Sequence, residues 1–374
     1  MGHNCGDSLH HRPFELGFAM APLFFRTSNW RAVGSWGATL VLLLSITLGA
    51  SSQGQSQMPI AQDAPPRSTQ PLPGQRRQET VAPDYRINAL QKDFKGKLWV
   101  GSWQGLTQID PATGKVLARI SLPNVTIGAL AQDKVGRIWV GTYDGLKRID
   151  PRTNEITAQN FLLPSNRVLA LLVDLRGYLW VGTDGGLALI SPDEGLLMTT
   201  IKDLPGVSAH ALSLDSDRQL WVATLEGMVR IDTASAKVMT RIQEVPGGVV
   251  QTLTRSPRGG LWAGTPNGLL EIDYKTGQVL RSVTKLKGRN VTAIRFDKAG
   301  SVWAGTSNGL MRVNPYNGAI LGEVYNLPAN RILALAPDTG NKLWVGTSEG
   351  LAWVSMTTYR TGTHRLLSRP PETE

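Results

Sequence analysis

A tryptophan recurs along most of this 374-residue chain at an almost constant interval. The interval is 40 residues once and 41 residues at each later step, and the tryptophans are Trp99, Trp139, Trp180, Trp221, Trp262, Trp303 and Trp344. Self-similarity at a fixed period of this size is the signature of repeat architectures. The spacing therefore predicts one repeat domain of seven units, rather than the two or three unrelated domains that the chain length alone suggests.

Turn signals divide each unit into four short strands. An apolar run such as residues 168–173 comes first and ends in a D-x-x-G turn at residues 174–177. The tryptophan strand follows, and a turn such as Asn267-Gly268 leads into the third strand. A four-stranded antiparallel unit of this size cannot cover both of its apolar faces, so the units must stack around an axis. We predict an all-β fold, a seven-bladed β-propeller of four-stranded antiparallel blades over residues 85–370, with the tryptophans packed between blades.

Closure of the ring is predicted to need no exchanged strand. The first strand is expected to start near Ile87 and the last strand to run over residues 364–368, so every blade is contiguous in sequence. A threonine three residues after most of the tryptophans, such as Thr142, is expected to form a hydrogen bond near the turn that follows the second strand.

The first 84 residues differ from the repeats in composition. Residues 1–50 are interpreted as a leader, because residues 32–50 are uncharged, have an apolar centre and follow Arg26 and Arg31. A cleaved signal peptide and an uncleaved signal anchor both fit, and translation from Met20 would give the leader an ordinary length. Residues 51–84 are rich in Pro, Gln and Ser and are predicted to be a disordered linker. Either leader places the repeats in the periplasm or outside the cell, with the membrane contacted only through an anchor at residues 32–50.

Charge and cysteine usage exclude several functions. The formal net charge is +10, but Lys and Arg are spread over most units and form no arginine-rich arm, so no nucleic-acid partner is expected. Cys5 is the only cysteine, which removes disulfides and cysteine-based metal sites from the repeats. Only His210 and His364 lie outside the leader, so a site of three histidine ligands is excluded. We expect no cofactor, no metal and a monomeric chain.

The repeated phrase D-x-x-G-x-hydrophobic-W-V-G-T-x-x-G-L-x-x-hydrophobic-D resembles the two-component regulator propeller repeat in all seven units. The resemblance implies an extracytoplasmic sensor propeller of the type attached to transmembrane histidine kinases, which recognises ligands such as oligosaccharides. No kinase portion is visible in these residues, so a free-standing relative is expected. Some units depart from the pattern. Ala223 replaces the usual glycine of the fourth unit, while Arg218 and Asn341 stand where the turn glycine is expected in the fourth and seventh units.

Differences between units point to a binding site at the channel mouth. In propellers, the connections between blades share one face with the turns between the second and third strands. Aligning the units on their tryptophans puts Arg86, Arg167 and Arg331 at one equivalent position on that face. The sixth unit has Asn290 at this position, directly after Arg289, and His210 of the fourth unit lies two positions further along its strand. Such arginines bind carboxylate, phosphate or sulfate groups. In the alternative interpretation each arginine pairs locally with Asp84, Asp203 or Glu244 and is only solvated.

Two aromatic residues are predicted at turn tips on the same face. Trp103 and Tyr143 belong to adjacent units, where they can stack on a sugar ring or on a partner protein, or else pack along the edge of two blades.

The function predicted from these features is binding or sensing rather than catalysis. The expected partner is a small-molecule or oligosaccharide ligand, or an envelope protein such as a sensor kinase. One alternative is a lyase or hydrolase with its site near His210, because virginiamycin B lyases are similar in blade number and tryptophan repeats; here only His210 and Glu226 offer a partial analogue of their catalytic residues. Another alternative is an assembly scaffold in the cell envelope.

Overall fold

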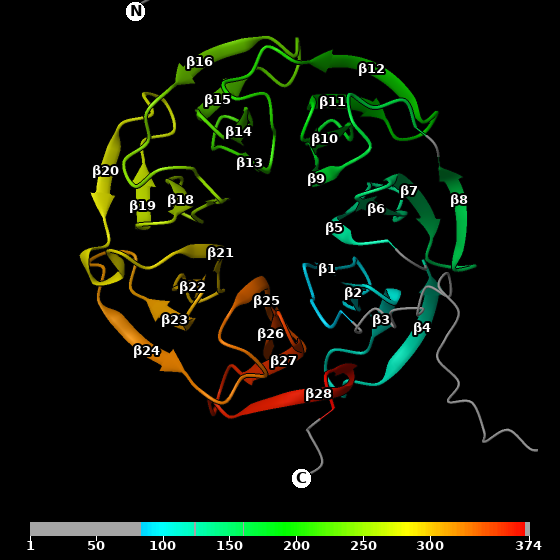
Figure 1. The fold of residues 1–374 in the computed structure, drawn as a ribbon, viewed down its shortest axis with the longest axis vertical. Helices are drawn as coiled ribbons and strands as arrows, with labels where there is room; N and C mark the ends of the chain where they lie inside the picture. The colour runs from blue at the N-terminus through cyan, green and yellow to red at the C-terminus, as the bar shows by residue number, and fades with distance from the viewer. Residues whose placement is uncertain (1–83, 123–124, 160, 371–374) are drawn as a thin grey trace, which may run out of the picture. The chain divides into compact units, whose positions relative to one another are not determined.

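The computed structural model describes residues 84–122, 125–159 and 161–370 of the chain. Within these residues, 28 strands form seven separate four-stranded antiparallel sheets. Figure 1 shows the seven sheets as blades arranged around one axis, which confirms the predicted all-β, seven-bladed propeller. The leader predicted at residues 1–50 and the linker as far as residue 83 lie outside the described residues.

In each blade the first strand lies nearest the axis and the fourth lies at the rim (Figure 1). The innermost strands are β1 (Ala89–Lys92), β5 (Ile127–Gln132), β9 (Val168–Val173), β13 (Ala211–Leu214), β17 (Thr252–Arg255), β21 (Val291–Phe296) and β25 (Ile332–Thr339). The second strands, which carry the repeated tryptophans, are β2 (Leu98–Ser102), β6 (Ile138–Thr142), β10 (Leu179–Thr183), β14 (Leu220–Thr224), β18 (Leu261–Thr265), β22 (Val302–Thr306) and β26 (Lys342–Thr347).

The third strands are β3 (Gly105–Ile109), β7 (Gly145–Asp150), β11 (Gly186–Ser191), β15 (Gly227–Ile231), β19 (Gly268–Ile272), β23 (Gly309–Val313) and β27 (Gly350–Ser355). The rim strands are β4 (Val116–Ser121), β8 (Glu155–Gln159), β12 (Leu196–Ile201), β16 (Val238–Ile242), β20 (Val279–Ser282), β24 (Ile320–Val324) and β28 (Thr361–Ser368). A short 3-10 helix, η1 (Thr284–Leu286), precedes β21. Among the residues that the structure describes, no helix has the length and apolarity needed to cross a membrane.

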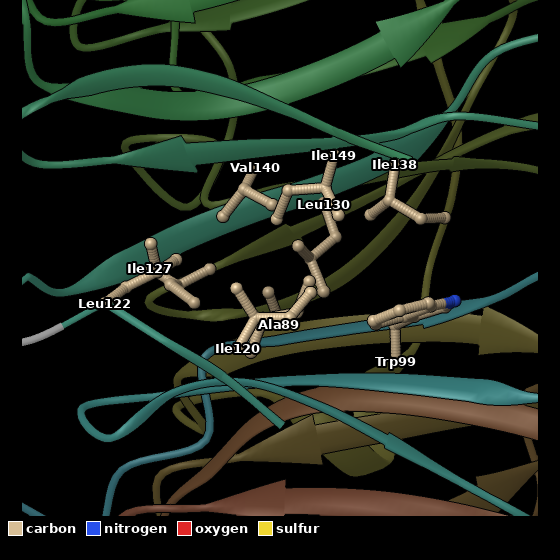
Figure 2. Packing of buried hydrophobic residues seen from close by; sticks show 10 residues of the cluster. Ala89, Trp99, Ile120, Leu122, Ile127, Leu130, Ile138, Val140 and Ile149 are labelled. Carbon is tan, nitrogen blue, oxygen red and sulfur yellow. The ribbon is translucent and has the colours of Figure 1, made fainter. Parts of the chain in front are cut away.

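The hydrophobic core lies between neighbouring blades. Every residue of β2, β6 and β10 is buried, because both faces of these strands are covered by other blades. Trp99 from the first blade packs with Ile127 and Ile138 from the second blade in one cluster (Figure 2). All seven tryptophans are at most 1% exposed, which confirms their predicted role in packing between blades.

The aspartates of the D-x-x-G turns form hydrogen bonds with the tryptophans of this core. In four blades the indole Nε1 of the tryptophan donates to an aspartate six residues earlier; the 3.0 Å bond from Trp139 to Asp133 is an example. The other three blades lack this bond. In the fourth blade Asp215 instead accepts from Arg230 at 2.7 Å, and in the fifth blade Ser256 stands at the aspartate position. In the seventh blade the Asp338 carboxylate accepts the amide of Lys298.

The two residues that replace the turn glycine adopt the backbone conformation that glycine has in the other blades. Arg218 and Asn341 have φ values of 66° and 60°, so the turn keeps its left-handed residue even where glycine is replaced. The predicted threonine hydrogen bond is also confirmed, since Thr142 Oγ1 donates to the Gly145 carbonyl at 2.7 Å, and five further blades repeat the threonine bond.

The seventh blade meets the first without an exchanged strand, as predicted. The Ile87 amide donates to the Thr347 carbonyl at 3.0 Å, and the His364 imidazole bonds the Gly114 carbonyl at 2.8 Å. Ile87 therefore packs at the junction of the two blades, and the first strand starts two residues later than expected, at Ala89. The last strand starts earlier than expected, at Thr361.

Candidate functional site

One face of the ring carries both the connections between blades and the turns between second and third strands. Main-chain hydrogen bonds hold the two kinds of loop together, as between Tyr143 N and Thr126 O at 3.0 Å and between Ser348 N and Arg331 O at 3.1 Å. The residues selected from the sequence are therefore positioned by the backbone around one end of the axis. We call this face the mouth face.

Arg86 is paired locally on the mouth face. Its Nε lies 2.8 and 2.7 Å from the two carboxylate oxygens of Asp84. This hydrogen bond lowers the pKa of Asp84 and raises the pKa of Arg86. For Arg86 the structure thus matches the alternative interpretation, in which a neighbouring carboxylate satisfies the arginine.

Arg167 and Arg331 differ from Arg86 because, among the described residues, neither forms an ion pair. Arg331 is exposed. The Arg167 guanidinium lies over the ring of Tyr143, 4.6 Å from its centroid. A guanidinium in this position is attracted by the aromatic face and keeps donors free for a ligand. Arg167 therefore joins the third blade to a turn of the second blade.

Arg289 lies against the outer strands of its own blade. One of its nitrogens contacts the Met311 sulfur at 3.5 Å, and another is 3.9 Å from a Glu323 oxygen. The nearest carboxylate lies on β24, so the guanidinium turns towards the rim. The neighbouring Asn290 is half-buried, and its side-chain oxygen has no hydrogen-bond partner among the described residues. The structure thus does not assemble the predicted arginines into a single cluster.

Tyr143 is the more exposed of the two predicted aromatic residues, at 43%. Its ring crosses Gly128 of β5, where an added Cβ would lie 3.2 Å from the ring and 2.6 Å from the Val168 carbonyl. The absence of a side chain at Gly128 thus leaves room for the Tyr143 ring next to a residue that lines the channel. Trp103 is half-buried, and it makes no aromatic contact with Tyr143 in the described part of the chain.

His210 lines the central channel and connects two blades. Its Nε2 is 2.5 Å from the Val250 carbonyl, and because a carbonyl can only accept, Nε2 carries the proton. Burial lowers the pKa of His210, so the ring is neutral at pH 7. Thr292, at the equivalent position two blades later, bonds the Ile332 carbonyl at 2.6 Å in the same way.

The geometry at His210 does not build a catalytic group with Glu226. No hydrogen bond joins these two residues in the described chain, and the same residues contain no cluster of three or more His, Cys, Asp or Glu side chains able to hold a metal ion. The Nδ1 atom of His210 is buried and has no partner there. The observed role of His210 is to tie the fourth blade to the fifth.

The central channel is a cavity of about 210 Å³ lined by residues of all seven innermost strands. Amide side chains of Asn88 and Gln251 lie in the lining at the same repeat position as His210. Further along the strands the lining includes Arg295 of β21, which the sequence analysis did not select. Repeat alignment does contain the signal, since the equivalent residues are all uncharged: Gln91, Ala131, Leu172, Ser213, Thr254 and Ala336.

A larger cleft of about 690 Å³ lies at the rim between the sixth and seventh blades. Tyr325 and Tyr359 line it, and both are at least half exposed. Gly322 of β24 also lines the cleft, where an added Cβ would meet no atom within 4 Å.

The fold and the mouth face define the class of this protein as a seven-bladed propeller with an open channel and an aromatic–arginine pair at one entrance. The family model described as the two-component regulator propeller matches residues 121–144 and 326–349. These two segments therefore match the repeat of that family, which confirms the resemblance predicted from the repeated phrase.

Solved structures with the same fold come from two functional classes. The extracellular domain of a hybrid two-component system from B. thetaiotaomicron is 20% identical, with a TM-score of 0.60; the match covers 71% of this chain and 39% of that chain. Virginiamycin B lyase from Staphylococcus aureus, solved with quinupristin, is 19% identical, with a TM-score of 0.61, over 72% of this chain and 94% of the lyase. A streptogramin B lyase is 18% identical, with a TM-score of 0.60, over 72% and 92% of the two chains. At these identities the likeness shows the fold alone. Curated protein sequences contain no match to the chain.

Proposed function

We propose that this chain is an exported binding or sensing propeller, and that its mouth face is the recognition surface. The family repeats support a sensor-like role, and a propeller of the same fold forms part of the extracellular domain of a two-component system protein. The ligand is an oligosaccharide or another small molecule, or the partner is an envelope protein such as a sensor kinase.

The observation that carries the proposal is the exposed pair of Tyr143 and Arg167. Tyr143 is 43% exposed, and the Arg167 guanidinium lies over its ring without a carboxylate partner. A ring face binds the apolar face of a sugar, while guanidinium donors bind hydroxyl, carboxylate or sulfate oxygens. The two side chains come from different blades, so their spacing is fixed by the ring.

The test is an oligosaccharide array that includes neutral, carboxylated and sulfated glycans. Wild-type protein is expected to bind a subset, and Tyr143→Ala or Arg167→Ala should weaken that binding at least about tenfold, which corresponds to the loss of one stacked or charge-assisted contact. The matched control is the pair Arg258 and Tyr316, a second cation–π contact at 4.3 Å that lies at the turns of the opposite face. Arg258→Ala and Tyr316→Ala should leave binding unchanged.

Equal binding by the mouth-face variants and wild type would contradict the proposal. Loss of binding in Tyr325→Ala alone would move the site to the rim cleft. Stable co-purification with an envelope protein that survives Tyr143→Ala and Arg167→Ala, without any glycan binding, would instead favour an assembly scaffold.

A lyase is the second candidate, because His210 lines the channel with a free Nδ1 and the fold is shared with two streptogramin-type lyases. The assay is loss of quinupristin in the presence of the protein, with His210→Gln as the comparison. The binding proposal predicts no turnover by either protein. Turnover by wild type that His210→Gln abolishes would establish the lyase instead.

A further inference from the structure

We propose that the central channel is a second binding site, which holds a small organic anion bearing one carboxylate with Arg295 as its counter-ion. The site lies inside the ring and uses none of the mouth-face side chains. It therefore stands or fails independently of the proposed function.

Arg295 is an arginine without an acidic partner. It lies on β21 in the lining of the channel, and its Nη1 donates only to the carbonyl of the preceding residue, Ile294, at 2.8 Å. Two less exposed arginines are paired, Arg230 with Asp215 at 2.7 Å and Arg312 with Asp297 at 3.2 Å, whereas Arg295 is open to the solvent of the channel. In the described chain no carboxylate lies within ion-pair distance of Arg295, so most of its donors are free.

The surroundings of Arg295 make an anion favourable there. Solvent reaches the side chain through the channel, yet the blades exclude enough water to lower the pKa of its guanidinium. The group stays charged at pH 7, because an arginine starts from a very high pKa. An enclosed cation with low-dielectric walls concentrates the field along the channel and attracts a counter-ion.

The net charge of the lining favours a monoanion. Arg295 is the only charged residue in the described lining, because the imidazole of His210 is neutral. The site therefore supplies one positive charge. A carboxylate carries one negative charge and matches a guanidinium in two-point geometry. Phosphate carries between one and two negative charges at pH 7, so binding its dianion here would leave negative charge uncompensated.

The rest of the lining favours a short ligand that can also form hydrogen bonds. The channel exposes more polar than apolar surface, because Leu253 and Leu335 of the lining are buried in the hydrophobic clusters between blades. Arg295 lies three residues along its strand from Thr292, which is at the level of the amides, and this is a separation of about 10 Å. A carboxylate of a few carbons spans that length and fits the cavity of about 210 Å³.

The fold does not require arginine at this position. The equivalent residue in the first blade is Gln91, on the same kind of innermost strand. Arg295→Gln should therefore fold normally and remove only the charge.

The test is isothermal titration calorimetry of the full chain with butyrate and, separately, with inorganic phosphate, at low ionic strength. Wild type is expected to bind one butyrate per chain and to bind phosphate more weakly. Arg295→Gln should weaken butyrate binding at least tenfold. The matched control is Arg241→Gln, which removes the same charge from the rim strand β16, where Arg241 pairs with Asp203, and should not change butyrate binding.

Three results would overturn the inference. They are no butyrate binding by wild type, equal binding by wild type and Arg295→Gln, and tighter binding of phosphate than of butyrate. Circular dichroism and the unfolding temperature of Arg295→Gln confirm that any loss of binding comes from a folded protein.

Discussion

At the scale of single residues, the carboxylate of Asp133 links a surface turn to the core between blades. One of its oxygens accepts the Arg137 amide at 2.9 Å, and the other accepts the Trp139 indole at 3.0 Å and the Arg137 guanidinium at 2.6 Å. A buried donor left without a partner costs more than an ordinary hydrogen bond contributes. The aspartate should therefore matter more than its position in a turn suggests.

We predict opposite effects on stability from removing the aspartate in one blade and introducing an aspartate at the equivalent position of another. Asp133→Ala should lower the free energy of unfolding by about 3 kcal/mol, because several buried donors lose their acceptor at once. Ser256→Asp in the fifth blade should raise it by about 1 kcal/mol, because the Trp262 indole has no partner in the described structure. Urea denaturation measures both; a neutral Asp133→Ala would show that the bond carries no stability.

The lowered pKa of His210 should make the free energy of unfolding depend on pH. Burial lowers the pKa of His210 in the folded state, so below the unfolded value of about 6.5 the unfolded chain binds more protons than the folded chain. The contribution of His210 is therefore fully present above that pH and is lost as the pH falls. His210→Gln, which places the side chain of the equivalent Gln251 in the fourth blade, should flatten the stability profile between pH 5 and 7, measured by urea unfolding at each pH. A profile identical to that of wild type would contradict this.

The role of a residue could be predicted from the sequence where the same residue type has the same role in every blade. Seven tryptophans and the threonines that follow them occupy one environment, so their positions alone indicate packing and turn bonding. The orientations of Arg86 and Arg289 depend instead on carboxylates that differ between blades, Asp84 and Glu323, which no periodicity reveals. Arg295 lies three residues further along its strand than Thr292, where the equivalent residues of the other blades are all uncharged.

At the scale of strands, the blades approach so closely that a Cβ is excluded at two glycines of the second strands, although Ala223 occupies the equivalent position in the fourth blade. A Cβ added to Gly182 of β10 would lie 2.2 Å from the carbonyl oxygen of Ala209 in the next blade. The same clash recurs at Gly346 of β26, where the Ile87 carbonyl oxygen would be 2.4 Å away. Backbone cannot move aside as a flexible side chain can, so these glycines set the distance between blades.

The corresponding prediction compares two glycines. Gly182→Ala should lower the free energy of unfolding by about 2 kcal/mol, because the methyl group forces the fourth blade away. Gly322→Ala on the rim strand β24 is the control and should cost less than about 0.5 kcal/mol, since its added Cβ would meet no neighbour. Thermal or urea unfolding of both variants gives the comparison; equal effects would argue against blade spacing as the cause.

The turn residues in the sequence were enough to predict the number and order of the strands, but not the residues at which the strands end. The seventh blade shows why: β25 continues to Thr339, which pairs with Lys342 across a tight turn at Gly340 and Asn341. The extended hairpin moves Asp338 out of reach of the Trp344 indole and towards the Lys298 amide. Such a shift depends on contact with the neighbouring blade, which local turn chemistry does not contain.

At the scale of the whole molecule, the ring is closed by packing and by a few hydrogen bonds. Ile87 packs with Leu98, Trp344 and Leu351 in a cluster that joins the seventh blade to the first. The His364 and Lys342 side chains reach the Gly114 and Ala112 carbonyls of the first blade. Each blade thus depends on two neighbours, and both the mouth face and the channel exist only while the circle is complete.

The most direct test of this dependence is equilibrium unfolding of a chain that ends at Asn330 and so lacks the seventh blade. Removal leaves the flanks of the first and sixth blades uncovered, including the core around Trp303. We predict that the shortened chain loses the near-ultraviolet circular dichroism of the buried tryptophans and shows no cooperative urea transition. A cooperative transition at the midpoint of the full chain would contradict the closed ring of seven mutually dependent blades.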